Sequence, residues 1–296
     1  MTIKERYERF KVWQLHAFEW SYDENKPHHC VNCENDFTGN YCPHCSQKAG
    51  VGKITWKSVL QSAAEVWGMH NRSLLYTLWQ LIWRPGYFIS DYINGRRQVS
   101  FPPVKTLVIM GIIGAVIDYL FKAPDITRQA ITEGSSFEDQ FLAWVEANPG
   151  WGSLSIVCFF LIPTWCIFRY APRNARHSLP QGFFIQVFMG IQFLIIDILA
   201  DFFGDFFYIM VPMCYFYVYR QLFGYNFWGN LWRVLLMFMS GILLALFAIS
   251  FPDWLIRGST NNSKHLFLFV ILAVVFMIAG MLISKMLAKH KKLSKY

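Results

Sequence analysis

Residues 266–284 read LFLFVILAVVFMIAGMLIS and contain no charged side chain, and the basic sequence KMLAKHKKLSK follows at 285–295. An apolar α-helix of about 20 residues is long enough to cross the ~30 Å hydrocarbon layer of a membrane. The stretch therefore predicts a transmembrane helix, followed by a basic tail at the membrane surface. Such a tail is attracted to anionic lipid headgroups. A disordered, solvated tail is the alternative.

The whole chain is apolar. Of its 296 residues, 54% are hydrophobic and 16% are charged, and the mean hydropathy of +0.28 is too high for an ordinary soluble domain. We therefore predict an all-α polytopic membrane protein with about six transmembrane helices. The expected spans are 104–121, 152–169, 183–200, 206–223, 231–251 and 266–286. Only DFFGDFF around Gly204 separates the third span from the fourth, which predicts a tight hairpin, with one long merged helix as the alternative.

The positions of the basic residues predict the orientation. Residues 1–26 lack the uninterrupted apolar core of a secretory signal, so the N-terminus is expected in the cytosol. Six spans then leave 23 of the 27 Lys and Arg residues on the cytosolic side, together with both termini. Because this asymmetry explains the basic pI of about 9.1, we expect no nucleic-acid partner.

Four cysteines form the most specific motif. Cys30 and Cys33 make one Cys-x-x-Cys pair, Cys42 and Cys45 make another, and the eight residues ENDFTGNY separate the pairs. Four thiolates complete a closed tetrahedral site, which is typical of structural Zn²⁺. We predict a zinc ribbon with a small β-hairpin in the spacer. A redox pair and an iron–sulfur site are the alternatives.

The sequence RPGYFISDYINGRR at 84–97 predicts a short helix between two turns. Pro85 suits the first turn of a helix, and Gly95 suits a left-handed cap at its end. One interpretation is a positively charged anchor at the cytosolic surface. The other is a site for a phosphate or lipid headgroup, in which a carboxylate orients an arginine. The residues of that site are Arg84, Asp91, Arg96 and Arg97.

Together, these motifs resemble a family of bacterial inner-membrane proteins that is known only as a domain of unknown function with an N-terminal zinc ribbon. The resemblance covers residues 30–121 and includes F-x-G-x-Y-C-P-x-C at 37–45, the RPG segment, and FPP before a hydrophobic span. It implies a location in the bacterial inner membrane and no particular reaction. Ribbons of the family have Gly after the second Cys of each pair, whereas this chain has Glu34 and Ser46.

The chain divides into four expected regions. In 51–103, the apolar residues of ITWKSVLQSAAEVWGM recur at helical spacing, and SLLYTLWQLIW places tryptophans near its end. Both segments suit helices that lie at the headgroup level or pack on the cytosolic face of the bundle. The regions are an amphipathic helix at 1–26, the ribbon at 27–50, interfacial helices and the RPG joint at 51–103, and the six-span domain with its basic cytosolic tail at 104–296.

Four aspartates lie in or near the expected spans, toward the outer surface. Charged groups within membranes are costly and commonly face a cavity, so a cation path or proton relay is one interpretation. The other is that they lie at interfacial helix ends. These residues are Asp118, Asp197, Asp201 and Asp205.

No H-E-x-x-H, G-x-S-x-G or G-x-x-x-x-G-K-[ST] motif occurs, so the sequence does not predict an enzyme. We expect a scaffold or regulator whose cytosolic ribbon docks a protein partner. The alternatives are a transporter or channel whose path includes Asp118 and Asp197, and a lipid-handling protein that uses the arginines of residues 84–97.

Overall fold

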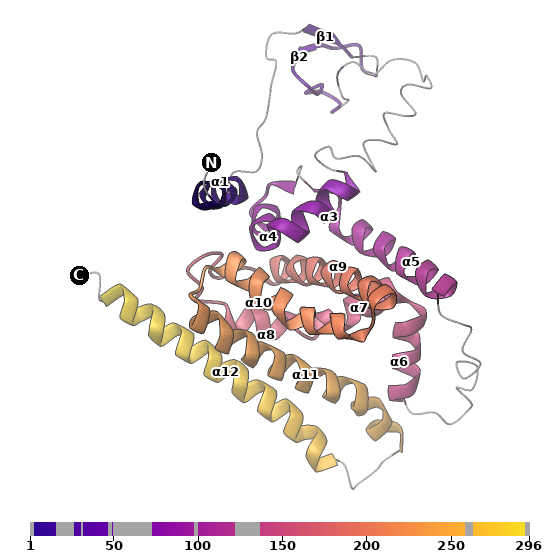
Figure 1. Cartoon of the computed structure of the whole chain (residues 1–296), viewed down its shortest axis with the longest axis vertical. Helices are drawn as coiled ribbons and strands as arrows, with labels where there is room; N and C mark the ends of the chain where they lie inside the picture. Colours follow the sequence, from indigo (N-terminus) through magenta and orange to yellow (C-terminus); the bar gives the residue numbers. More distant parts are fainter. Residues whose placement is uncertain are drawn as a thin grey trace. The chain divides into compact units, whose positions relative to one another are not determined.

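The computed structural model describes residues 3–15, 27–30, 32–46, 49, 73–97, 100–121, 137–257 and 263–293. The chain forms two compact units, Met1–Tyr76 and Thr77–Tyr296 (Figure 1). The helix expected within ITWKSVLQSAAEVWGM lies outside the described residues and stays a prediction.

The first unit contains a helix and a small hairpin. Helix α1 spans Ile3–Leu15, almost all of its side chains are exposed, and the rings of Phe10 and Trp13 stack with their centroids 5.8 Å apart. It forms part of the helix expected at 1–26, of which residues 16–26 lie outside the described part.

The hairpin pairs β1 (Pro27–His29) with β2 (Asp36–Thr38) in antiparallel register, with His28 opposite Phe37. The expected hairpin is therefore present, but only β2 lies in the spacer between the cysteine pairs, because β1 precedes the first pair. The first cysteine pair itself occupies the hairpin loop. Phe37 from β2 packs with two of the cysteines in a small buried cluster.

The described part of the second unit is helical, and five of its helical segments are long and apolar enough to cross a membrane. They match five of the six expected spans and fit a membrane protein. The segments are α5 (Pro103–Phe121), α7 (Pro149–Cys158) continued by α8 (Leu161–Ile167), α9 (Leu179–Phe203), α11 (Phe227–Arg257) and α12 (Ser263–Leu293). A further helix, α6 (Phe137–Ala147), precedes α7, and α11 and α12 lie side by side (Figure 1).

The expected fourth span, 206–223, is not among the five. It consists of the 3₁₀-helix η3 (Asp205–Ile209) followed by α10 (Met210–Phe223), which has only 14 residues. A 3₁₀-helix rises about 2 Å per residue and an α-helix about 1.5 Å, so the two together extend about 31 Å. The segment therefore reaches across a bilayer only if its 3₁₀ part is included.

The predicted hairpin between the third and fourth segments is present, and the merged helix is excluded. Gly204, at φ 104°, ends α9 in a backbone conformation that favours glycine. The chain then reverses, because the Tyr208 hydroxyl donates to Asp197, 2.6 Å away on the preceding helix.

Glycines bring α5, α7 and α9 together. A Cβ at Gly111 of α5 would lie 2.4 Å from the backbone of Gly150 in α7, and one at Gly190 of α9 would lie 3.1 Å from Leu107 Cδ1. Small residues at such crossings let membrane helices approach closely. A Cβ at Gly114 would lie 3.9 Å from Ile198 Cγ1. Because Leu107 and Gly114 of α5 meet Gly190 and Ile198 of α9 in the same order, the two helices run parallel.

Gly111→Ala is therefore expected to destabilise the bundle by about 1–3 kcal/mol, because backbone atoms of Gly150 cannot move aside cheaply. Gly114→Ala is the matched control on the same helix, since its Cβ would make only ordinary contact with Ile198. Thermal unfolding of the purified proteins in detergent measures both. Equal behaviour of the two variants would contradict the close crossing.

Several polar side chains are buried in this unit, and many large apolar ones are exposed. In α3 (Leu74–Trp83), Thr77 and Gln80 are buried, whereas Trp79, Ile82 and Trp83 are 42–57% exposed. This is the reverse of a helix on a soluble protein and suits contact with lipid. The buried face packs on α9, where the Gln192 side-chain amide donates to the Leu81 carbonyl at 2.9 Å. Packing on the bundle and an apolar outer face thus occur in the same helix.

Candidate functional site

The four predicted cysteine ligands lie together in the first unit. Their Sγ atoms are all within 4.8 Å of one another, with 3.4 Å between Cys30 and Cys45 and 3.5 Å between Cys33 and Cys42. A Zn–S bond of about 2.3 Å places the sulfur atoms of a tetrahedral site about 3.8 Å apart. The cluster therefore fits one tetrahedral metal ion with protein sulfur at all four positions.

Two equivalent turns hold the cysteine pairs. The Glu34 N–H donates to the Cys30 carbonyl at 2.8 Å, and the Ser46 N–H donates to the Cys42 carbonyl at 2.9 Å. Glu34 has φ 59° and Ser46 has φ 61°, both left-handed. In the family that the motifs of this chain resemble, Gly occupies these two positions. Gly adopts this conformation without strain.

Glu34→Gly and Ser46→Gly are each expected to stabilise the ribbon by about 0.5–1 kcal/mol. In the left-handed conformation, the Cβ of Glu or Ser crowds the backbone, and Gly has no Cβ. Metal transfer to a chelator should then slow about two- to fivefold. Asn40→Gly is the control, because Asn40 is not among the residues with positive φ. Equal slowing in all three variants would argue against relief of strain.

The pKa values of two of the ligand thiols shift in opposite directions. The backbone N–H of Asn35 lowers the pKa of the Cys33 thiol, but burial and the neighbouring sulfur atoms outweigh it and raise that pKa to about 12. A thiol with so high a pKa is a poor nucleophile in the absence of a metal. The pKa of Cys42 is lowered instead, because burial, which raises it, is outweighed by the backbone N–H groups of Cys45 and His44. Beside the cluster, His29 Nδ1 lies 2.7 Å from Asp36 Oδ1, so its ring faces that carboxylate rather than the sulfur atoms.

The RPG joint lies in the second unit and forms α4 (Pro85–Ile93), with Pro85 in its first turn and Gly95 at φ 106° after its end, as the sequence predicted. Arg84 Nη2 lies 2.7 Å from Asp91 Oδ2, and the side chains are only 1% and 17% exposed. Arg96, whose side chain is 65% exposed, lies 3.5 Å from the other oxygen of the same carboxylate. Asp91 thus lies between a buried arginine and an exposed one.

Helix α4 packs directly against α10 through a glycine. A Cβ at Gly86 would lie 2.4 Å from both the Val218 carbonyl and the Gln221 Cβ, so only glycine fits. The Gln221 side-chain oxygen accepts the Gly86 N–H at 3.0 Å. The RPG joint is therefore part of the bundle rather than a linker on its surface.

Asn174 connects two helices through hydrogen bonds, and this role was not predicted from the sequence. Its side-chain amide donates to the Leu222 carbonyl at 2.8 Å and to Ser90 at 3.0 Å, and its oxygen accepts from Asn94 at 2.9 Å. It links the ends of α4 and α10 to the loop before α9. Its φ of 49° is one that Asn tolerates well, so an Asn in the polar sequence RNAR was the available signal.

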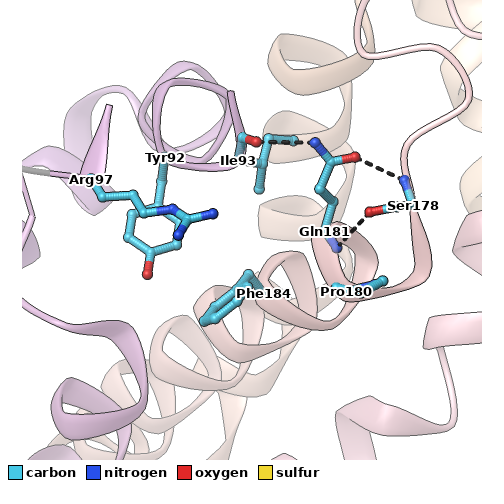
Figure 2. Close-up of a pocket in the computed structure, with 7 residues that line it drawn as sticks. All are labelled: Tyr92, Ile93, Arg97, Ser178, Pro180, Gln181 and Phe184. Atoms are coloured by element: carbon cyan, nitrogen blue, oxygen red, sulfur yellow. Dashed lines mark hydrogen bonds between the residues drawn. The ribbon is translucent and has the colours of Figure 1, made fainter. Parts of the chain in front are cut away.

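Arg97 is separated from the other three residues of the predicted headgroup site. It lines a cavity of about 290 Å³ between the end of α4 and the start of α9. Figure 2 shows its guanidinium group beside the ring of Tyr92, on the side that faces Gln181 and Phe184. Burial raises the pKa of Tyr92, and the positive charge of Arg97 partly offsets this rise. Arg84 and Arg96 do not line this cavity.

The aspartates of the predicted intramembrane site lie at one end of α5 and α9. Asp197 is half-buried and bonded to Tyr208, Asp201 is half-buried, and Asp205 is exposed at the start of η3. Asp118 is half-buried and lies about one turn after Gly114 on α5. Because α5 and α9 run parallel and Gly114 lies beside Ile198, Asp118 lies at the level of the turn of α9 that carries Asp201.

The described structure thus combines apolar helices that fit a membrane protein with a four-cysteine cluster that fits a metal ion. A protein-family model described as "Protein of unknown function (DUF3667)" matches residues 72–114, so this part of the chain is similar to that family. The match covers α3, α4 and the first part of α5 and does not include the ribbon. Comparisons with curated proteins and with solved structures found no match.

Proposed function

We propose that the chain is a scaffold or regulator in the bacterial inner membrane, with both termini in the cytosol and a zinc-bound ribbon that docks a protein partner. The observation that carries the proposal is the closed set of four sulfur ligands. A catalytic zinc ion keeps one position open for water or substrate, whereas a structural one does not. In the described part of the ribbon, the buried core consists of Cys30, Phe37 and Cys42, so the metal stands in for a larger apolar core.

Tyr41 is the residue of the ribbon best suited to contact a partner. Its side chain is 47% exposed, and it directly precedes the metal ligand Cys42, so the metal site holds its backbone in place. Tyrosine contributes strongly to interfaces because its large ring loses little conformational freedom on binding.

The test compares tagged wild type with Tyr41→Ala and with a variant in which all four ligand cysteines are serine. Each is cross-linked in cells, purified in mild detergent, and analysed for bound zinc and proteins by mass spectrometry. We expect stoichiometric zinc and one near-stoichiometric protein in the wild type. Tyr41→Ala should keep the zinc and lose the protein, and the cysteine variant should lose both.

Tyr7→Ala is the matched control, because Tyr7 is 57% exposed in the same unit but outside the ribbon. It should keep zinc and partner. Recovery of the same proteins with wild type and with the four-serine variant would reject docking by the ribbon.

A transporter or channel is the second candidate, supported by the parallel register that puts Asp118 level with Asp201. In this proposal, Asp118 and Asp197 line the path of a cation or proton. Reconstituted Asp118→Asn and Asp197→Asn variants should lose at least tenfold in cation or proton flux, whereas Asp205→Asn, at an exposed position, should retain it. Wild-type flux in both buried-site variants would reject this function.

A further inference from the structure

The charge on the described wall of the cavity between α4 and α9 is positive. Among the described residues that line it, Arg97 is the only charged one. The nearest acid along the chain, Asp91, is already in contact with Arg84 and Arg96. Within the described residues, Arg97 makes no ion pair, so its charge is available to a ligand.

Ser178 adds a hydrogen-bond donor to the same wall. Its hydroxyl oxygen accepts the N–H of Gln181 at 3.4 Å in the capping box of α9, which leaves its own hydrogen to donate. The Gln181 side chain donates to the Ile93 carbonyl at 3.0 Å and accepts the Ser178 N–H at 2.8 Å, so it closes one side of the cavity (Figure 2). Side-chain donors from Arg97 and Ser178 thus face a space that no carboxylate of the described part of the chain lines.

The rest of the wall is apolar. The rings of Tyr92 and Phe184 meet with their centroids 5.3 Å apart, and Ile93 and Pro180 complete the lining. The volume of about 290 Å³ is larger than a phosphate ion needs. It leaves room for a short non-polar group beside the anion.

We propose that this cavity binds an anionic phosphate group through the Arg97 guanidinium and the Ser178 hydroxyl. A planar guanidinium can donate to two phosphate oxygens at once, which a lysine cannot reproduce. The same chemistry recognises a phospholipid headgroup and free phosphate. The buried arginine of the joint, Arg84, keeps α4 in place and does not contact the ligand.

Binding is tested on full-length, delipidated protein in an uncharged detergent. The probes are dioctanoyl phosphatidylglycerol, inorganic phosphate, and dioctanoylglycerol, which has the same acyl chains without phosphate. The proteins are wild type, Arg97→Gln and Arg96→Gln, with thermal unfolding as the check of folding. Arg96 is the matched control because it is an adjacent, exposed arginine outside the cavity.

Arg97→Gln is expected to weaken phosphatidylglycerol binding at least tenfold, and Arg96→Gln less than threefold. Dioctanoylglycerol should not compete. If inorganic phosphate binds with the same dependence on Arg97, the site takes phosphate from either source; if only the lipid binds, the site is a headgroup site. Equal losses in the two variants, or equal binding of lipids with and without phosphate, would overturn the proposal.

Discussion

Removing the metal is expected to unfold the ribbon while the helical unit Thr77–Tyr296 stays folded. The ribbon has two strands of three residues each and a core of three buried side chains, which cannot offset the loss of chain entropy. Metal binding in such segments supplies folding free energy on the order of 10 kcal/mol. Hydrogen exchange measured by mass spectrometry, with and without a zinc chelator under reducing conditions, should show full loss of protection over residues 27–46 and no change in α9.

Acid should have the same effect as the chelator. The ligands bind as thiolates, and without metal the pKa of Cys33 lies above that of a free thiol, so binding releases protons. Metal affinity must therefore fall as the pH is lowered and rise as it is raised. Cys158→Ser, which changes a cysteine of α7, should leave both titrations unaltered. A ribbon that stays protected after the metal and any disulfide have been removed would refute this account.

Asp91→Ala is expected to destabilise the second unit by about 3 kcal/mol, near the lower end of the range for breaking a buried ion pair because Asp91 is partly exposed. The variant leaves Arg84, 1% exposed, without its carboxylate. Chemical unfolding of the purified protein in detergent measures the loss. The double variant Arg84→Met with Asp91→Leu should regain much of it, since an apolar pair of similar size needs no counter-charge.

Arg96→Gln is the control for this ion pair. Its side chain is 65% exposed and its distance to Asp91 is 3.5 Å, so the expected effect is less than about 1 kcal/mol. A loss in Asp91→Ala no larger than that in Arg96→Gln would mean that the buried pair does not stabilise the bundle.

Local patterns predicted most of the helical architecture. Uncharged apolar runs such as 266–284 are necessary for spanning a bilayer, so they identified five of the long helices without any knowledge of their neighbours. The segment 206–223 is less apolar, because it contains Arg220 and four tyrosines, and whether it forms one α-helix or a 3₁₀ turn and a shorter helix depends on how the chain reverses at Gly204. Hydropathy contains no information on that reversal.

The two candidate sites also differ in how much of each could be predicted from the sequence. The cysteine cluster was predictable because its ligands come from two short motifs within one segment. The four residues proposed for a headgroup site are also close in sequence, yet the structure divides them: Asp91 holds Arg84 and Arg96, and Arg97 faces a cavity completed by Ser178. The cavity could not be predicted, and for Asn174 the sequence RNAR indicated a left-handed turn but not its hydrogen bonds, since these depend on contacts between distant segments.

The contact between Gly86 and Gln221 imposes an order on assembly during synthesis, because the two residues are 135 positions apart. A ribosome adds about 5–20 residues per second, so the partner of α4 emerges roughly 7–27 s after α4 itself. During that delay, Asp91 is already present in the same helix to neutralise Arg84. The exposed tryptophans of α3 can hold the segment at the membrane surface. The first helices of this unit to be synthesised thus reach their final positions only after α10 has been made.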